Sequence, residues 1–426
     1  MRLPYGRETI EWKIKKERLR GVIATRLCRE VLTETAGEMV RRALENPVAS
    51  PRLCELAKDK HKVVIVTSDH TRAMPSRVTL PALLAEIRRG NPQADITILV
   101  ATGLHRAVTR EELIEKCGEE LVSAERFVCH DCDDEAGLVS LGRLPSGGPL
   151  TVNRLAAEAD LLVAEGLIEP HFFAGFSGGR KSILPGIAGR ACVMYNHSAA
   201  MIDHPCARTG VCEGNPVHRD MLFAAEAAGL AFVLNVVCDE NRRLVHAVAG
   251  DREAAHLEGV AYLEERCTAD PIPADIVVST NGGYPLDRNI YQAVKGMDTA
   301  ARCVAPGGVI VMLAQAADGT GSAMFFDALA EEPDVEKLYR AILARAPEDT
   351  LPDQWQVQIL ARVLLRARVI LVSDCDPETV RRMHLIPAAN IAEAMTIAGR
   401  ILGNDEAGVT VIPDGVSTVI RERSRV

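Results

Sequence analysis

The segment His171–Gly186, HFFAGFSGGRKSILPG, contains the densest group of side chains able to do chemistry. It combines a histidine, an arginine and a lysine with closely spaced glycines, and His197 follows it in the sequence MYNHS. A glycine-rich backbone can approach a ligand closely and direct its N–H groups at an anion. The segment therefore predicts a site for an anionic ligand, and we expect the rest of the chain to position it.

Part of this segment, Gly175–Ser182, nearly matches a phosphate-binding P-loop. The first glycine, the lysine and the serine have the P-loop spacing, but Arg180 stands where that loop needs a second glycine for its turn. Nucleoside-triphosphate hydrolysis is therefore disfavoured. Two interpretations stay open, a backbone nest for one phosphate and a glycine-rich turn with a solvated Arg–Lys pair.

Other charged and titratable side chains follow predicted strands. The planar guanidinium of Arg72 can hold a carboxylate through two parallel hydrogen bonds, and Lys295 from the second half of the chain could close over the same group. Imidazole titrates near neutral pH, so His105 and His171 are candidate acid/base groups. This combination indicates a small anionic substrate.

Metal-ligating patterns are sparse in the sequence. His197 is a candidate ligand, but no HExxH motif or pair of CxxC motifs accompanies it. The single CxxC, Cys129–Cys132, is interpreted as two cysteines at a strand end rather than as a zinc or redox site. The chain offers too few ligands to hold a metal alone, which points to a metal carried on an organic cofactor.

Composition excludes several classes of protein. The 426 residues are 47% hydrophobic, and 49 Lys and Arg against 58 Asp and Glu give a net charge of −9, so no general affinity for nucleic acid is expected. No apolar run is long enough to span a bilayer, and the charged N-terminus is unlike a signal peptide. The twelve cysteines are mostly scattered singly, as in reduced proteins, so we expect a cytoplasmic location.

Short β-rich runs alternate with amphipathic helical patterns such as LPALLAEIRR and WQVQILARVLLRA. Continuous apolar strands separated by helices predict parallel sheets covered on both faces. In such sheets ligands bind beyond the carboxyl ends of the strands, where the polar clusters fall. The predicted strands are 63–67, 96–102, 160–164, 232–237, 276–279, 309–313, 369–372 and 409–412.

The length and this pattern predict an α/β protein of two doubly wound, Rossmann-like parallel-sheet domains with the active site in the cleft between them. The boundary is expected at Thr268–Ala274, where two prolines separate a helix from a strand. Residues 1–270 would form the first domain, with the lysine and histidines, and residues 271–426 a second domain that closes over the substrate.

Motifs along nearly the whole chain resemble the nickel-pincer nucleotide-dependent lactate racemase family. The most specific are HFFAGFSGGRKSILPGIA and NIYQAVKGM, supported by SDHTR, ATGLHR, STNGGYPLD, PDQW and VTVIPDG. One departure is Ala107, where the family pattern leads us to expect proline after His105 and Arg106. This substitution affects a loop and no reacting group.

The resemblance implies a cofactor and a role for each site residue. The cofactor is nickel on pyridinium-3,5-bisthiocarboxylic acid mononucleotide, covalently attached to Lys181, with His197 as the protein's nickel ligand. His105 and His171 would be the catalytic acid/base pair. Further cofactor contacts are expected from Asp69, Gly178, Gly179, Arg180 and Ser182. Substrate contacts are expected from Arg72, Tyr291, Gln292, Lys295 and Trp355.

The resemblance implies reversible hydride transfer from lactate to this cofactor through pyruvate. Removing the C2 hydrogen of a 2-hydroxy acid as hydride leaves an ordinary keto acid, whereas its removal as a proton beside a carboxylate is very difficult. Cofactor biosynthesis proteins would be transient partners. Malate, 2-hydroxyglutarate or an aromatic 2-hydroxy acid is an alternative substrate, although Phe172 and Phe173 favour a small one. A non-catalytic phosphate- or nucleotide-binding protein is the alternative from another class.

Overall fold

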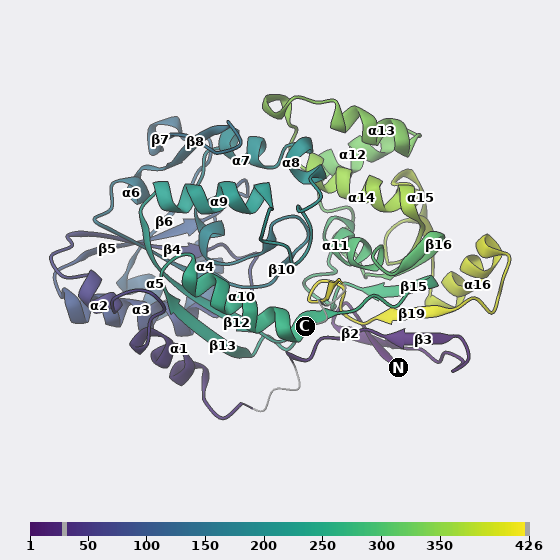
Figure 1. Cartoon of the computed structure of the whole chain (residues 1–426), viewed down its shortest axis with the longest axis horizontal. Coiled ribbons are helices and arrows are strands. Elements are labelled where there is room, and N and C mark those ends of the chain that lie inside the picture. Colours follow the sequence, from purple (N-terminus) through teal and green to yellow (C-terminus); the bar gives the residue numbers. More distant parts are fainter. Residues whose placement is uncertain (28–31, 422–426) are drawn as a thin grey trace.

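The computed structural model describes residues 1–27 and 32–421, which form two lobes, each built on a six-stranded sheet (Figure 1). The first sheet has the order β13-β12-β9-β4-β5-β6, and all its neighbours are parallel except β13, which runs antiparallel to β12 at the edge. Its strands are β4 (Lys62–Ser68), β5 (Asp95–Ala101), β6 (Arg126–Cys129), β9 (Leu161–Leu167), β12 (Leu230–Cys238) and β13 (Leu244–Gly250).

Both faces of this sheet are covered, as the apolar runs predict. In β4, Val63 and Ile65 pack into the same core as α1 (Ala36–Glu45) and α3 (Ser76–Gly90). The alternate residues Val64 and Val66 pack with α9 (Pro216–Ala227) on the opposite face. Successive strand side chains point to opposite faces, so a strand covered on both sides must be apolar throughout.

The second sheet is parallel throughout, in the order β18-β17-β16-β15-β19-β3. One face packs with α11 (Ile290–Ala300) and α14 (Gln354–Arg366), and the other with α16 (Ile391–Leu402). Its strands are β3 (Leu19–Val22), β15 (Ala274–Thr280), β16 (Val304–Leu313), β17 (Arg368–Val372), β18 (Ile386–Ala388) and β19 (Val409–Ile412). The predicted α/β class with parallel sheets is thereby confirmed.

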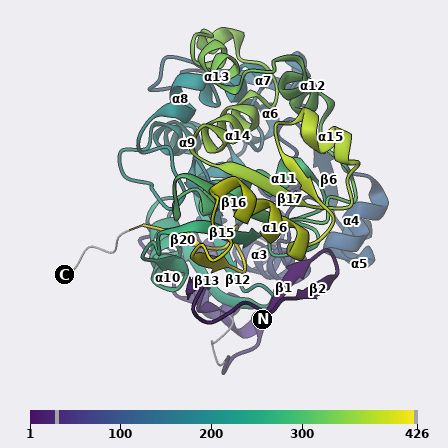
Figure 2. The same ribbon diagram turned by 90° about the vertical axis from the view of Figure 1, so that its right-hand side faces the viewer.

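The N-terminal residues join the second lobe. Strand β3 pairs in parallel with β19 through Leu19 and Val409, and the hairpin β1–β2 (Arg2–Tyr5, Glu8–Glu11) lies against the same lobe (Figure 2). The sequence division had grouped residues 1–270, but here the chain begins in the second lobe and then crosses to the first. No strong apolar periodicity marks β3, which explains why the sequence did not indicate this crossing.

Shorter elements complete the lobes, and no described helix is long and apolar enough to cross a membrane. The further helices are α2 (Leu53–Leu56), α4 (Arg110–Cys117), α5 (Glu119–Ala124), α6 (Arg154–Ala157), α7 (Arg190–Asn196), α8 (Ala199–Asp203), α10 (Ala254–Cys267), α12 (Ala323–Glu331), α13 (Val335–Leu343) and α15 (Pro377–Arg382), with 3-10 helices at Glu135–Gly137, Gly179–Ser182 and Pro347–Asp349. The further strands are β7 (Leu138–Arg143), β8 (Pro149–Asn153), β10 (Pro170–His171), β11 (Gly175–Phe176), β14 (Thr268–Ala269) and β20 (Val419–Ile420).

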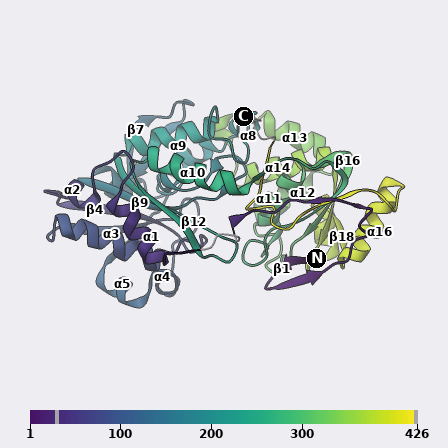
Figure 3. The ribbon, with the colours of Figure 1, turned by 60° about the horizontal axis from the view of Figure 1, so that its bottom comes forward.

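The carboxyl ends of the central strands of the first lobe face the second lobe. The loops after β4 and β5 carry Arg72 and His105, and the short strand β10, which contains His171, lies at the inner edge of the first lobe (Figure 1). Helix α11 lies on the inner side of the second lobe, next to the first lobe (Figure 3). A single apolar cluster that includes Val66 and Leu360 extends through both lobes.

Candidate active site

A pocket lies at the junction of the two lobes. Its lining combines positively charged, negatively charged and apolar side chains. A small molecule with a charged group and an apolar group could contact both kinds of side chain there. The residues that matter below are Arg72, Glu169, His171 and Phe172 from the first lobe and Lys295 and Val416 from the second. The predicted cleft between domains is therefore present in the structure.

His171 and Lys181 form a close pair beside this pocket. The backbone N–H of Ala174 donates to His171 Nδ1 at 3.2 Å, and His171 Nε2 lies 2.9 Å from Lys181 Nζ. Because Nδ1 accepts, a neutral imidazole carries its proton on Nε2 and donates it to the lysine nitrogen. A lysine nitrogen accepts a hydrogen bond only as an uncharged amine.

Electrostatics agree with this geometry. Burial, followed by the charge of Arg72, holds the pKa of Lys181 well below its usual range. Burial and the charge of Lys181 likewise keep the pKa of His171 well below that of a free imidazole. Both shifts favour the uncharged forms, a nucleophilic amine beside a neutral imidazole.

His105 is oriented by a buried carboxylate. Asp69 Oδ2 lies 2.7 Å from His105 Nδ1, and Thr71 Oγ1 donates to Asp69 Oδ1 at 2.6 Å. The Asp69 side chain is 3% exposed and that of His105 is 53% exposed. Burial alone would raise the pKa of Asp69, but the hydrogen bond and charge of His105 with the Thr71 hydroxyl hold it at about 2. The carboxylate fixes the Nδ1–H form of His105, leaving Nε2 as the free base.

His197 follows the last residue of α7 and is 5% exposed. Its ring contacts Phe173 and, from the second lobe, Trp355, each with centroids 5.0 Å apart in edge-on geometry. The buried Nδ1 atom has no hydrogen-bond partner among the described residues. Burial, followed by the charge of Lys181, lowers the pKa of His197 to about 3. Burial thus favours the neutral imidazole, which keeps one ring lone pair that a metal could use.

The second lobe contributes its side chains from α11 and the start of α14. The Tyr291 hydroxyl donates to Asp353 Oδ1 at 3.0 Å and accepts from Trp355 Nε1 at 3.2 Å. Lys295 Nζ lies 6.0 Å from the centroid of the Phe172 ring, across the junction. Burial, followed by the charge of Arg72, lowers the pKa of Lys295 to about 8. No hydrogen bond or ion pair of the Lys295 amine occurs within residues 1–27 and 32–421.

Helix α11 is placed by its N-cap. The side chain of Asn289 accepts from the backbone N–H of Gln292 at 3.0 Å, and this contact starts the helix at Ile290. One helical turn later Lys295 faces the pocket, while Tyr291 and Gln292 are absent from the described lining. Tyr291 acts here through its contact with Trp355, and a direct substrate contact of Tyr291 or Gln292 stays a prediction.

Comparisons with known proteins agree over the whole chain. Residues 5–210 match the family model of the lactate racemase N-terminal domain, and residues 269–420 match that of the lactate racemase C-terminal domain. The chain belongs to the lactate racemase family. It is 50% identical to lactate racemase of Thermoanaerobacterium thermosaccharolyticum over 422 residues, which are 99% of both chains. It is 46% identical to lactate racemase of Lactiplantibacillus plantarum over 420 residues, 98% of this chain and 99% of the relative.

Solved structures agree with this membership. The lactate racemase apoprotein from T. thermosaccharolyticum superposes with a TM-score of 0.96 at 50% identity, covering 99% of both chains. A Thermotoga maritima protein of 19% identity has a TM-score of 0.67 and covers 91% of this chain and 98% of that one. This second likeness concerns the fold alone.

In this member of the lactate racemase family, Arg180 holds the backbone beside Lys181, and its cofactor contact stays a prediction. The side chain is 0% exposed, and its guanidinium donates to the carbonyls of Ala174 and Phe176 at 3.0 and 2.8 Å and to His218 Nδ1 at 3.0 Å. A further N–H lies 2.7 Å from His256 Nε2. Burial lowers the pKa of Arg180 to about 10. The buried cation fixes the turn that leads into Lys181.

Of the two interpretations left open for the glycine-rich turn, the structure favours close packing, and the cofactor contacts of Gly178, Gly179 and Ser182 stay predictions. The N–H of Gly179 donates to Asn235 Oδ1 at 2.9 Å, and the Ser182 hydroxyl donates to the carbonyl of Glu165 at 3.3 Å. Gly178 adopts φ 84°, a conformation that favours glycine, and a Cβ there would meet Ile168 at 2.8 Å. These residues pack the turn against β9 and β12, so their density reflects close packing and not a P-loop.

The sequence did not predict the places of two carboxylates. The predicted strand 160–164 would place Glu165 just beyond its end. In the structure β9 continues to Leu167, so the Glu165 carboxylate lies in the core and accepts hydrogen bonds from the Ser76 and Thr79 hydroxyls. Glu169 lines the pocket and was not singled out as a site residue. Its place directly after the true end of β9 is the signal that could have identified it.

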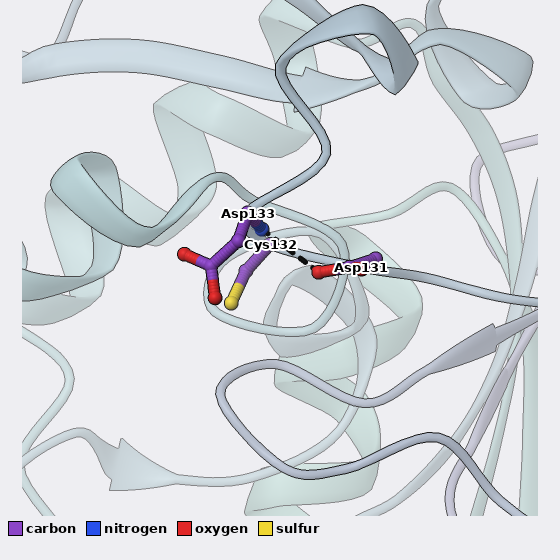
Figure 4. A group of neighbouring side chains, drawn as sticks. All are labelled: Asp131, Cys132 and Asp133. Carbon is purple, nitrogen blue, oxygen red and sulfur yellow. Dashed lines mark hydrogen bonds between the residues drawn. The ribbon is translucent and has the colours of Figure 1, made fainter.

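Outside the pocket, Asp131, Cys132 and Asp133 form a group close enough for metal ligation in the described part of the chain (Figure 4). Arg190 already occupies both oxygens of Asp133, each at 2.6 Å. The Cys132 thiol is a free cysteine, and burial raises its pKa. The geometry therefore supports a turn held by an ion pair, which agrees with the strand-end interpretation of the CxxC.

Proposed function

We propose that this protein interconverts D- and L-lactate by reversible hydride transfer to a nickel-pincer nucleotide attached to Lys181. The observation that carries the proposal is the neutral Lys181 amine, hydrogen-bonded to His171 at the edge of a pocket that also contains Arg72 and Lys295. The family relationship supports the same activity, since both relatives described above are named lactate racemase.

The residues of this chain fit that cofactor. An uncharged lysine amine is the form that can condense with a thiocarboxylic acid, where the new C–N bond replaces a C–O bond and water leaves, and burial of Lys181 favours this form. His197 is a buried imidazole whose Nδ1 has no hydrogen-bond partner among the described residues, and it would bind nickel through the lone pair of its neutral ring. When bound, the group would accept the C2 hydrogen of the substrate as hydride.

The substrate carboxylate would be held from both lobes. Arg72 has an exposed guanidinium and Lys295 an amine without a partner in the described structure, and both line the pocket. Charge-assisted hydrogen bonds from two directions would fix the carboxylate while C2 changes configuration. The keto acid could then turn its other face without leaving the protein.

The two histidines would move only the hydroxyl proton. His105 has its free base at Nε2, because Asp69 fixes the proton on Nδ1. His171 has its proton on Nε2, because Ala174 donates to Nδ1. One histidine is therefore ready to accept a proton and the other to give one, as inversion of an alcohol requires.

A racemisation panel tests this proposal. The protein would be produced together with the cofactor-making proteins, and each enantiomer of lactate, malate, 2-hydroxyglutarate and an aromatic 2-hydroxy acid would be supplied separately. We expect nickel in the purified protein and fastest racemisation of lactate. A faster reaction with another 2-hydroxy acid would assign that substrate instead, and a nickel-loaded protein that racemises none of them would refute the proposal.

A further inference from the structure

Glu169 is an acidic residue in the lining of the pocket, where the other charged residues of the described chain, Arg72 and Lys295, are cations. Its backbone is fixed, because its N–H donates to the Ser177 hydroxyl at 2.8 Å and its carbonyl accepts from the Ser177 N–H at 2.8 Å. The carboxylate itself makes no hydrogen bond or ion pair with the described residues. A negative charge is therefore held at the pocket wall without neutralisation by a direct partner.

The charge of Glu169 reaches the groups that act on the substrate. It raises the pKa of Lys181 and of Lys295, opposing the effect of Arg72, so its carboxylate lies within electrostatic range of both amines. Glu169 is also only two residues from His171. A substrate held by Arg72 and Lys295 would therefore lie close to this carboxylate.

The remaining lining offers no cation for a second acidic group. Arg72 and Lys295 would both be occupied by the first substrate carboxylate. Apart from histidine, the charged residue that then remains in the described lining is Glu169, which is negative. The rest of the lining is uncharged: it includes the apolar side chains of Phe172, Leu286 and Val416 and the hydroxyls of Ser177, Thr209 and Thr299. A second carboxylate would lose water there and face the like charge of Glu169 without a cation to offset it.

We propose that Glu169 is a specificity-determining residue that excludes 2-hydroxy acids with a second carboxylate, so that the pocket accepts monocarboxylates. This inference rests on the proposed function, because it takes the site for a 2-hydroxy acid to be this pocket. Selectivity here comes from a repulsive group set against the wrong substrate, rather than from an added contact to the right one.

The test compares Glu169→Gln, which removes the charge and keeps the shape, with Glu169→Asp, which keeps the charge. Glu258→Gln on the exposed face of α10 is a matched control that removes one carboxylate far from the pocket. For each cofactor-loaded variant, the inhibition constant of malate against lactate racemisation and the KM for lactate are measured. We expect Glu169→Gln to lower the malate constant by about tenfold or more, with the lactate KM changing much less.

The Asp variant and the Glu258→Gln control should behave like the unaltered protein. An unchanged malate constant in Glu169→Gln, or an equal change for lactate and malate, would overturn the inference. If the loaded protein racemises no 2-hydroxy acid, the proposed function fails, and calorimetric binding of lactate and malate to the apoprotein still decides the role of Glu169. A gain in malate affinity confined to Glu169→Gln would support it, and no such gain would refute it.

Discussion

The two walls of the pocket are built differently. In the first lobe both candidate acid/base histidines are held by a neighbour: His105 by Asp69, and His171 by Lys181. In the second lobe, Lys295 projects from α11 without a described hydrogen bond or ion pair. The first wall is thus organised before substrate arrives, whereas the second keeps a cation available for it. Chemistry depends on fixed geometry, and binding depends on unsatisfied charge.

Two arginines of the first lobe repeat this difference. Arg180 is fully buried and uses its guanidinium on backbone carbonyls and two histidines, while Arg72 is exposed and lines the pocket. The same side chain therefore holds backbone carbonyls at one position and stays available to an anion at the other. Residue type alone does not distinguish the two roles.

The largest effect is expected at Lys181. Replacement by alanine removes the nucleophilic amine, so the covalent mass adduct should disappear and racemisation should fall by about three orders of magnitude or more. Intact-protein mass spectrometry and a chiral lactate assay measure the two results. A Lys181→Ala protein with full activity would refute covalent attachment as a requirement.

The two arginines provide a matched pair. Arg180→Met leaves several buried carbonyls without a donor, so the free energy of unfolding should fall by about 3 kcal/mol. Arg72→Met should leave that free energy within about 0.5 kcal/mol but reduce kcat/KM by about ten- to a hundredfold. Denaturant titration and steady-state kinetics on both variants measure these two effects. Equal losses of stability and of kcat/KM in the two variants would show that the arginines do not differ in role.

Asp69→Asn should give a smaller catalytic loss. The amide can no longer hold the Nδ1–H form of His105 through a charged acceptor, so kcat should fall by about tenfold or more while KM changes little. Thr71→Val is a useful comparison, since it removes only the hydroxyl bond to Asp69. A change in KM without a change in kcat would assign Asp69 to binding instead.

The mildest change concerns pH. Lys295 has a pKa of about 8, and only its charged form attracts a carboxylate, so KM for lactate should rise as pH increases through about 8. Lys295→Arg keeps its charge throughout this range and should move the alkaline limb to higher pH. If KM rises at the same alkaline pH in both proteins, a group other than Lys295 controls binding.

The sequence predicted the scaffold better than the details of the site. Continuous apolar strands and amphipathic helices sufficed for the inner strands of both sheets, because burial on two faces leaves a clear pattern, whereas the edge strands β13, β6, β18 and β3 were not predicted. The pairing of β3 with β19 is a long-range contact of a short strand, which no local pattern encodes. Likewise, Arg180 and Arg72 look equally available in sequence, and only the packing around His218 and His256 shows that Arg180 is already engaged.

The most direct test of the proposed reaction follows the hydrogen at C2. L-lactate labelled with deuterium at C2 would be given to the cofactor-loaded protein in ordinary water, and the D-lactate formed would be analysed by mass spectrometry and NMR. Hydride transfer predicts that the label stays on C2 and that the reaction is slowed by a primary isotope effect. Loss of the label to solvent in the inverted product would contradict hydride transfer, because it would show that a histidine removes this hydrogen as a proton.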